Sequence, residues 1–268
     1  MNRRNLTTLI TFLLLAFVSG AQTQWWIGCR GVLAYSNFRE CGVSPSTYRG
    51  IAAAPDFNIV INTPRWRIIV NNNLMVGGYE NAQKPRFDFT SVAGYDHLRA
   101  KFLHPIDTLG RWTLLGGASV NEWAWLSYNS NLFNANMGFT NLIDASLHFR
   151  AEHTVTRNAR RRQLSRRWML HGDLSCAPVG VFFRPGFAYI DNYNATSEST
   201  ASVTLSSYEW HLKALPAVTT DFGISRLLDN GNRIGIGYGW NFVSSGNATA
   251  ASFFTADHQL YINLDFAL

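Results

Sequence analysis

Serine, histidine and charged side chains recur at every second position in three segments of this chain. The three series are Asp144, Ser146, His148, Arg150 and Glu152; His171, Asp173 and Ser175; and Glu209, His211 and Lys213. When a serine, a histidine and a carboxylate meet, they can supply the nucleophile, the base and the orienting group of an acyl-transfer site. The alternative is a structural network, in which the same side chains form ion pairs and hydrogen bonds with one another.

The spacing of these residues indicates β-strands. In the segment 141–152, five apolar residues alternate with the polar series: Ile143, Ala145, Leu147, Phe149 and Ala151. A strand places alternate side chains on opposite faces, whereas a helix would distribute both sets around its axis. The segment therefore predicts a strand with one apolar face and one polar face.

The last residues of the chain repeat this alternation. Leu260, Ile262, Leu264, Phe266 and Leu268 are separated by Gln259, Tyr261, Asn263, Asp265 and Ala267. A final amphipathic strand resembles the C-terminal strand through which bacterial outer-membrane barrels engage their insertion machinery. Such strands usually end in Phe, whereas this chain ends in Leu268, with Phe266 two places earlier. We expect the last strand to contact that machinery.

Turn-forming residues separate about ten such segments, and the lengths of their connections alternate. Outer-membrane barrels have long outer connections and short periplasmic turns. The expected long connections are 37–50, 80–86, 128–134, 184–207 and 244–256, and the expected short ones are 63–64, 105–110, 154–165 and 229–232. The segment 154–165 fits this alternation least well. The expected strands are approximately 25–36, 51–62, 65–79, 93–104, 111–126, 135–152, 166–180, 208–226, 231–243 and 255–268.

The predicted fold is therefore all-β: a transmembrane, antiparallel, up-and-down β-barrel of about ten strands, within a range of eight to twelve. Charged residues make up 15% of the chain, against about 25% in soluble domains. Aromatic residues reach 14%, which suits two membrane–water interfaces. A mean hydropathy of −0.06 argues against a bundle of transmembrane helices. A soluble β-sandwich is the alternative, but it would need more charge on its outer faces.

The N-terminus has the pattern of a secretory signal peptide. Arg3 and Arg4 precede a short apolar run over residues 6–18, and small residues follow at 19–21. The run is shorter than the roughly 20 residues that a transmembrane helix needs. We expect residues 1–21 to be cleaved and residues 22–268 to form the barrel. An uncleaved anchor is the alternative.

A run of arginines is a second candidate for binding: Arg157, Arg160, Arg161, Arg162, Arg166 and Arg167. The predicted topology places this run in a periplasmic turn near lipid headgroups, where it would contact anionic phospholipid or a periplasmic partner. A solvated turn is the alternative. The formal net charge is +6, but no aromatic residues interleave with the arginines, as a nucleic-acid surface would require. We therefore expect no nucleic-acid partner.

The three cysteines, Cys29, Cys41 and Cys176, do not form a complete disulfide framework. Cys29 and Cys41 are a candidate pair in an oxidising compartment, and three free thiols are the alternative. Their spacing matches no zinc-binding pattern. We expect no metal and no cofactor.

The glycine-rich run 231–239 contains neither the Lys-Ser/Thr of a phosphate loop nor a following helix pattern. In a barrel strand, small residues accommodate curvature or bulky neighbours. This is the interpretation that we favour for the run.

Several short motifs resemble a family of uncharacterised Bacteroidota outer-membrane proteins of unknown function. These motifs are the segment 44–50 (SPSTYRG), the segment 112–118 with its Leu-Leu-Gly-Gly core, the segment 128–131 (YNSN) with Asn134-Ala135, and the segment 178–185 (PVGVFFRP). They are spread over most of the mature chain. The resemblance implies a barrel and identifies no catalytic residues.

These observations predict a structural or interaction role in the bacterial outer membrane. The partners that we expect are membrane lipid, lipopolysaccharide and the insertion machinery. An eight-stranded barrel is just filled by its side chains and porins need about sixteen strands, so about ten strands leave a lumen mostly filled by polar side chains. We expect no catalytic residue and no enzymatic activity. A lipid-directed hydrolase and a narrow pore are the alternatives.

Overall fold

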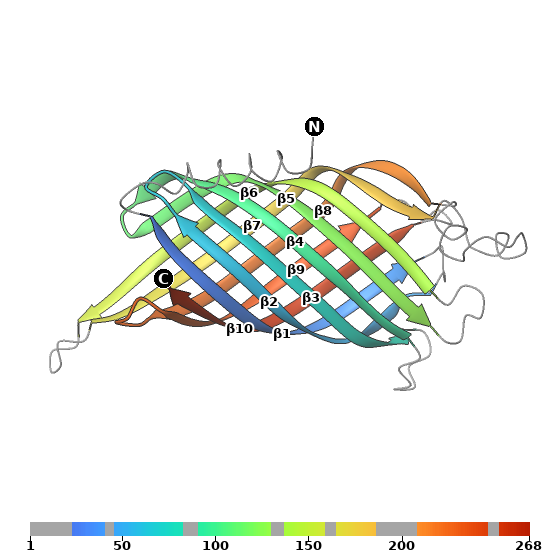
Figure 1. Ribbon diagram of the computed structural model, residues 1–268, viewed down its shortest axis with the longest axis horizontal. Coiled ribbons are helices and arrows are strands. Elements are labelled where there is room, and N and C mark those ends of the chain that lie inside the picture. The colour runs from blue at the N-terminus through green and yellow to red at the C-terminus, as the bar shows by residue number, and fades with distance from the viewer. Residues whose placement is uncertain are drawn as a thin grey trace, which may run out of the picture.

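The structure, a computed structural model, describes residues 23–40, 46–82, 91–129, 137–158, 165–185, 208–245 and 252–268. These residues form ten strands: β1 (Gln24–Glu40), β2 (Tyr48–Asn62), β3 (Arg67–Asn81), β4 (Ser91–Leu109), β5 (Trp112–Asn129), β6 (Met137–Asn158), β7 (Ser165–Pro185), β8 (Tyr208–Leu227), β9 (Arg233–Ser244) and β10 (Phe253–Ala267). Each strand pairs antiparallel with its neighbour in sequence, and β1 also pairs with β10, which closes the barrel (Figure 1). The predicted fold and the strand number are confirmed. Among the described residues, no helix has the length and apolar character needed to cross a membrane.

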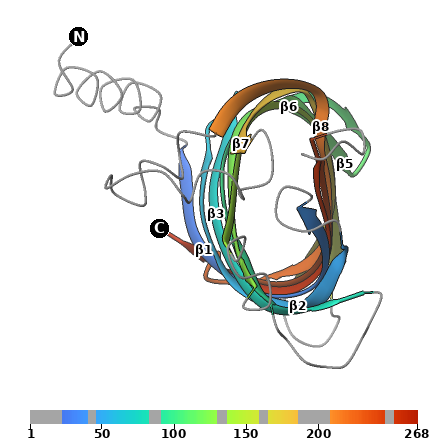
Figure 2. The ribbon, with the colours of Figure 1, turned by 90° about the vertical axis from the view of Figure 1, so that its right-hand side faces the viewer.

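Short turns gather at one end of the barrel, which we call the short-connection end. The β2–β3 turn is closed by a hydrogen bond from the Thr63 backbone N–H to the Trp66 carbonyl, at 2.8 Å. Gly231 adopts a φ of +85° in the β8–β9 turn, where a residue with a Cβ would be strained. The connections after β1, β3, β5, β7 and β9 leave from the opposite, long-connection end. Figure 2 looks along the barrel and shows how the strands enclose its interior.

Several strands are longer than the sequence predicts, and the extensions of β4, β6 and β7 shorten or replace predicted connections. The β6–β7 ladder continues to Asn158 and Ser165, so the connection covers only residues 159–164. This connection is therefore shorter than the predicted one and fits the alternation of short and long connections. The β4 strand continues through the predicted 105–110 turn to Leu109, with a register irregularity between Pro105 and Asp107. Antiparallel pairing sustains both extensions, because their backbone groups find partners across the ladder.

The alternation predicted for residues 141–152 is confirmed in β6. Leu147 and Phe149 are 63% and 49% exposed on the outer face, whereas Asp144 and His148 are buried in the interior. The last strand follows the same rule, with Leu260, Ile262, Leu264 and Phe266 on the outer face. The barrel therefore has an apolar outer surface and a filled interior.

The interior contains an apolar cluster as well as buried polar side chains. Five fully buried side chains, contributed by five different strands, form the centre of an apolar plug: Met75, Trp123, Leu142, Phe182 and Val243. The polar lumen that the sequence predicts thus also contains an apolar layer. Glycines make room for such bulk, since a Cβ at Gly237 would overlap the ring of Tyr261.

Candidate functional site

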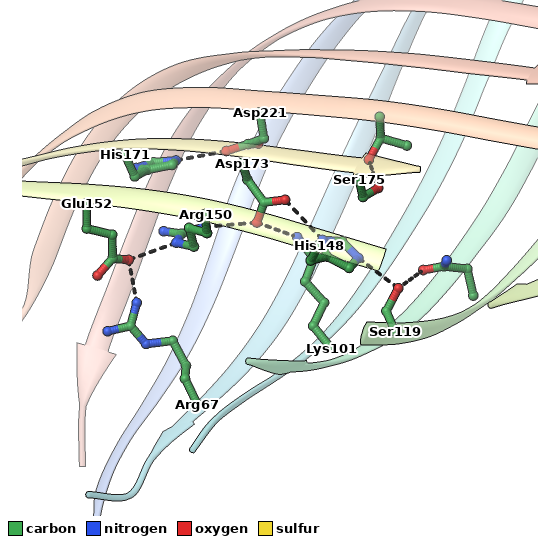
Figure 3. A network of polar contacts seen from close by, with 12 residues as sticks. Arg67, Lys101, Ser119, His148, Arg150, Glu152, His171, Asp173, Ser175 and Asp221 are labelled. Atoms are coloured by element: carbon green, nitrogen blue, oxygen red, sulfur yellow. Dashed lines mark hydrogen bonds and ion pairs between the residues drawn. The ribbon is translucent and has the colours of Figure 1, made fainter. Parts of the chain in front are cut away.

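The polar series of β6 and β7 point into the lumen, where they meet partners from across the barrel (Figure 3). Asp144, Ser146, His148 and Glu152 of β6 and Asp173 and Ser175 of β7 are all buried, and Arg150 and His171 are largely buried. In the ladder, Arg150 lies opposite Asp173 and Glu152 lies opposite His171. The predicted strands therefore bring these two series together.

Asp173 is the centre of the resulting network, which we call the lumen network. Its carboxylate accepts a hydrogen bond from Lys101 Nζ at 3.0 Å and lies 3.5 Å from a guanidinium nitrogen of Arg150. It also contacts His148 Nδ1 at 3.1 Å. The Asp173 side chain is only 3% exposed and the Lys101 side chain only 6%. A charge buried to this degree is tolerated because opposite charges and hydrogen bonds compensate its lost hydration.

The lumen network continues toward the short-connection end through Glu152. Arg150 Nε donates a hydrogen bond to Glu152 Oε1 at 2.8 Å, and Arg67 of β3 forms an ion pair with the same carboxylate. The Arg67–Glu152 pair crosses the lumen, since β3 and β6 are not neighbours in the barrel. This contact ties together two strands that are three places apart in the barrel wall.

A second carboxylate, Asp221 of β8, organises the adjacent wall. It contacts His171 Nε2 at 2.8 Å, accepts a hydrogen bond from the Tyr261 hydroxyl at 2.9 Å and lies 3.3 Å from the guanidinium of Arg30. The Arg30 guanidinium also lies over the Tyr261 ring, 4.6 Å from its centroid. Sequence reasoning missed Asp221, Arg30 and Lys101. The alternating pattern of each strand could have indicated that these three side chains face inward. The pattern could not have indicated which residues they contact.

The predicted members Glu209 and His211 do not join the lumen network. His211 lies opposite Phe182 in the β7–β8 ladder, whereas Asp173 lies opposite Asp221. Glu209 is two residues further away and lies opposite Arg184. The prediction failed because the alternation shows on which face of a strand a side chain lies, but not beside which residues of the neighbouring strands it lies. At a rise of about 3.3 Å per residue, His211 is roughly 30 Å along β8 from Asp221.

The structure also brings together a serine, a histidine and an aspartate in the order of a catalytic triad. Ser119 Oγ of β5 lies 2.8 Å from His148 Nε2, and His148 Nδ1 lies 3.1 Å from Asp173. The sequence suggested His148 and Asp173 but placed no weight on Ser119. This arrangement is chemically able to activate a serine hydroxyl.

Two features of this triad oppose catalysis. Ser119 is 2% exposed and the His148 side chain is fully buried, so a substrate would have to displace packed side chains to reach Oγ. Ser119 also lies in a continuous ladder, opposite Lys101 and Ser146, where backbone N–H groups pair with neighbouring strands instead of forming an oxyanion hole. Packing of the lumen therefore explains the contact between Ser119 Oγ and His148 without a catalytic role.

Asp144 forms a polar cluster of its own further along β6. It accepts hydrogen bonds from Asn121 Nδ2 at 2.6 Å, Ser146 Oγ at 2.7 Å and Trp123 Nε1 at 3.1 Å. Trp123 in turn stacks on Trp125, with ring centroids 5.5 Å apart. This cluster joins the lumen network to the apolar plug.

The predicted Cys29–Cys41 bridge conflicts with the geometry of β1. Cys29 is a free cysteine within the strand, and Cys41, which lies outside the described residues, is bonded to the last strand residue, Glu40. The strand from Cys29 to Glu40 spans roughly 35 Å, whereas a disulfide requires Cα atoms within about 7 Å. Cys29 and Cys176 are free cysteines among the described residues. No group of three or more His, Cys, Asp or Glu side chains in the described part of the chain is arranged to hold a metal.

The predicted basic turn is divided by the longer strands. Arg157 belongs to β6, Arg166 and Arg167 belong to β7, and Arg157 lies opposite Arg166 in the ladder. Arg167 is exposed at the short-connection end. Arg160, Arg161 and Arg162 lie outside the described residues.

A closed barrel pairs the backbones of neighbouring strands and presents an apolar outer face, which are the requirements for spanning a membrane with strands. The protein therefore has the fold and the outer surface of a transmembrane β-barrel.

Three solved structures are similar to this chain, each over most of both chains. The outer membrane protease OmpT from Escherichia coli has 7% identity and a TM-score of 0.44, over 92% of this chain and 96% of that one. The transport unit of the autotransporter AIDA-I from Escherichia coli has 9% identity and a TM-score of 0.42, over 98% and 99%. The translocator domain of the autotransporter NalP from Neisseria meningitidis has 9% identity and a TM-score of 0.39, over 97% and 95%. No family model and no curated protein matches the chain, so the Bacteroidota resemblance stays a prediction.

Proposed function

We propose that the protein is a sealed outer-membrane barrel with a structural or interaction role, and that it is neither a pore nor an enzyme. The observation that carries this proposal is the filled lumen. The apolar plug occupies one layer, and in another layer the lumen network joins strands that are not neighbours in the barrel wall. A solute would have to break buried ion pairs and displace aromatic side chains to pass.

The outer surface supports the same proposal. Large apolar side chains face outward on every strand, and aromatic residues such as Trp66 and Trp112 lie exposed at the short-connection end. Rings of this kind favour the headgroup level of a bilayer. We infer that membrane lipid and lipopolysaccharide surround this surface, that the long connections face outward, and that β10 engages the insertion machinery.

The test of sealing is electrical. Purified, refolded protein in a planar bilayer is expected to add no conductance above the lipid background. A variant with Trp123→Ala and Phe182→Ala, which removes two rings of the plug, is the matched positive control and is expected to give channel events. Discrete openings by the wild type would establish the narrow pore instead.

The Ser119–His148–Asp173 contacts favour one second candidate, a lipid-directed hydrolase. A fluorophosphonate probe labels an activated serine, so the wild type and Ser119→Ala should be compared at equal heat stability. We expect no label on either and no release of fatty acid from phospholipid or lipopolysaccharide. Labelling of the wild type that is lost in Ser119→Ala would establish the hydrolase.

A further inference from the structure

The outer face of the barrel carries an apolar groove of about 1140 Å³. Its lining comes from six strands that are consecutive in the barrel wall: β2, β1, β10, β9, β8 and β7. Neighbouring strands lie about 4.8 Å apart, so the groove is roughly 24 Å wide. Gly31, Ala53 and Pro55 deepen it, because their small side chains lie beside the exposed Leu33 and Leu260.

Three outward side chains border this groove on the side of the long-connection end, and we call them the outer-face cluster. The Tyr238 hydroxyl lies 2.6 Å from His258 Nδ1, within hydrogen-bond distance. Tyr35 lies opposite His258 in the β1–β10 ladder. His258 is exposed, and Tyr35 and Tyr238 are 46% and 37% exposed. Polar groups of this kind are costly among acyl chains but find partners at the level of lipid headgroups.

The height of the outer-face cluster agrees with a membrane–water interface. Trp25 lies on the same face of β1 as Tyr35, ten residues away and close to the short-connection end. Ten residues of strand cover about 33 Å, which at a tilt of about 40° is roughly 25 Å along the membrane normal. This is the height of the apolar band that separates the two aromatic girdles of membrane barrels. The groove therefore faces acyl chains, and the outer-face cluster faces the headgroups of the same leaflet.

Arg39 lies beyond the outer-face cluster, four residues from Tyr35 on the same face of β1. Its guanidinium lies over the Phe254 ring, 5.2 Å from the centroid. Within the described part of the chain, no carboxylate pairs with Arg39, whereas the neighbouring Arg49 pairs with Glu80 at 3.4 Å. A guanidinium at this level suits a lipid phosphate, because it can donate two parallel hydrogen bonds to the phosphate oxygens.

We propose that the groove, the outer-face cluster and Arg39 form a binding site for one molecule of lipopolysaccharide. A phosphate of this lipid contacts Arg39, its sugars lie against Tyr238 and His258, and its acyl chains lie in the groove. The site rests on the proposed function, in which the long-connection end faces outward, because lipopolysaccharide occupies the outward leaflet. The width of the groove favours this occupant. A lipid with several acyl chains on one phosphorylated body fills a groove that spans six strands, whereas a phospholipid has only two chains.

Native mass spectrometry of the folded barrel in detergent measures binding, with lipid A as the phosphorylated probe. The wild type is expected to retain one lipid A. Arg39→Gln is expected to bind it about tenfold more weakly, because a charge-assisted hydrogen bond is lost. Arg39→Lys keeps the charge and should bind more tightly than Arg39→Gln. Arg226→Gln removes an exposed arginine near the short-connection end and is the matched control, which should bind as the wild type does.

Two further comparisons test the phosphate and the groove separately. Lipid A without its phosphates should bind the wild type about as weakly as lipid A binds Arg39→Gln, and this variant should not distinguish the two probes. Gly31→Trp fills the groove at a position where an added Cβ meets nothing within 4 Å, so it should fold but bind both probes weakly. Val120→Trp adds the same ring to the outer face of β5, outside the groove, and should bind as the wild type does.

Three results would overturn the proposal. These are equal affinity of the wild type and Arg39→Gln for lipid A, equal binding by Gly31→Trp and Val120→Trp, and wild-type binding of phosphatidylglycerol as tight as that of lipid A. The last result would assign the groove to phospholipid. The planar-bilayer conductance of Arg39→Gln is expected to stay at the lipid background. Loss of the lipid site is thereby distinguished from failure of the sealed barrel.

Discussion

At the scale of single residues, the lumen network depends on a few carboxylates that each contact at least one cation and further polar side chains. Asp173 contacts Lys101, Arg150 and His148, and Asp221 contacts Arg30, His171 and Tyr261. Removing one member of such a group strands the others in a buried position, which costs more than the lost contact itself.

Asp173→Asn is expected to destabilise the barrel by about 3–5 kcal/mol, because it leaves Lys101 and Arg150 without a neutralising charge. The temperature at which the folded band disappears on an unheated-sample gel should fall accordingly. Asp229→Asn, at an exposed turn position, is the control and should leave that temperature unchanged. Equal stability of Asp173→Asn and the wild type would show that the ion pairs contribute nothing.

His148→Ala is expected to lower the unfolding temperature more than Ser119→Ala. The first change removes contacts to both Ser119 and Asp173 and leaves a cavity, whereas the second removes one hydrogen bond worth about 1 kcal/mol. His171→Ala, which loses its contact to Asp221, should also destabilise. Circular dichroism during heating measures all three, and an unchanged His148→Ala transition would contradict the packing role.

At the scale of elements, strand pairing sets which side chains meet, and glycines set how closely they approach. Gly237 of β9 lies beside Tyr261 of β10, whose hydroxyl reaches Asp221 of β8. Gly31 of β1 lies on the outer face, where an added Cβ would meet nothing within 4 Å. An alanine substitution adds the same methyl group at both positions, but this group would be crowded at Gly237 and would meet no neighbour at Gly31.

Gly237→Ala is expected to reduce the yield of folded barrel, because its Cβ would overlap the Tyr261 ring and lie 2.6 Å from the Phe222 carbonyl oxygen. Gly31→Ala should fold as the wild type does. Refolding into detergent, followed by gel mobility, compares the two. Equal yields would mean that the β9–β10 pair shifts to make room.

At the scale of the whole molecule, the two ends of the barrel differ in the lengths of their connections. The turns after β2, β4, β6 and β8 are short, and the connections after β1, β3, β5, β7 and β9 include the longest, 186–207. In membrane barrels the short turns face the periplasm. This comparison predicts an orientation that labelling on cells can test.

In a background in which Cys29, Cys41 and Cys176 are replaced by serine, Ser197→Cys should react with an impermeant thiol reagent on intact cells. Asn230→Cys, in the exposed β8–β9 turn, should react only after lysis. Mass spectrometry of the labelled protein distinguishes the two. The reverse pattern would invert the orientation, and recovery of unlabelled protein from the soluble periplasm would reject the membrane location.

The amino-acid sequence by itself determined the strands and their faces. Alternation separated Ile143 and Leu147 from Asp144 and His148, and the same rule assigned the two faces of the last strand, because successive side chains of any strand point to opposite sides. Turn residues and connection lengths were enough to predict ten strands, since each hairpin is a local feature. The glycine-rich run was correctly interpreted as room for a bulky neighbour, Tyr261.

Only the tertiary structure determined which inward-facing side chains lie at the same level of the barrel and which of them contact one another. Asp221, and not His211, lies opposite Asp173, and Ser119 contacts His148. The sequence could not show these contacts, because the register of each ladder depends on the closure of the whole barrel. The apolar plug draws one side chain from each of five strands, so no single segment revealed it. The extended strand β1 separates Cys29 from Glu40, because a strand converts each residue of separation in sequence into about 3.3 Å of distance.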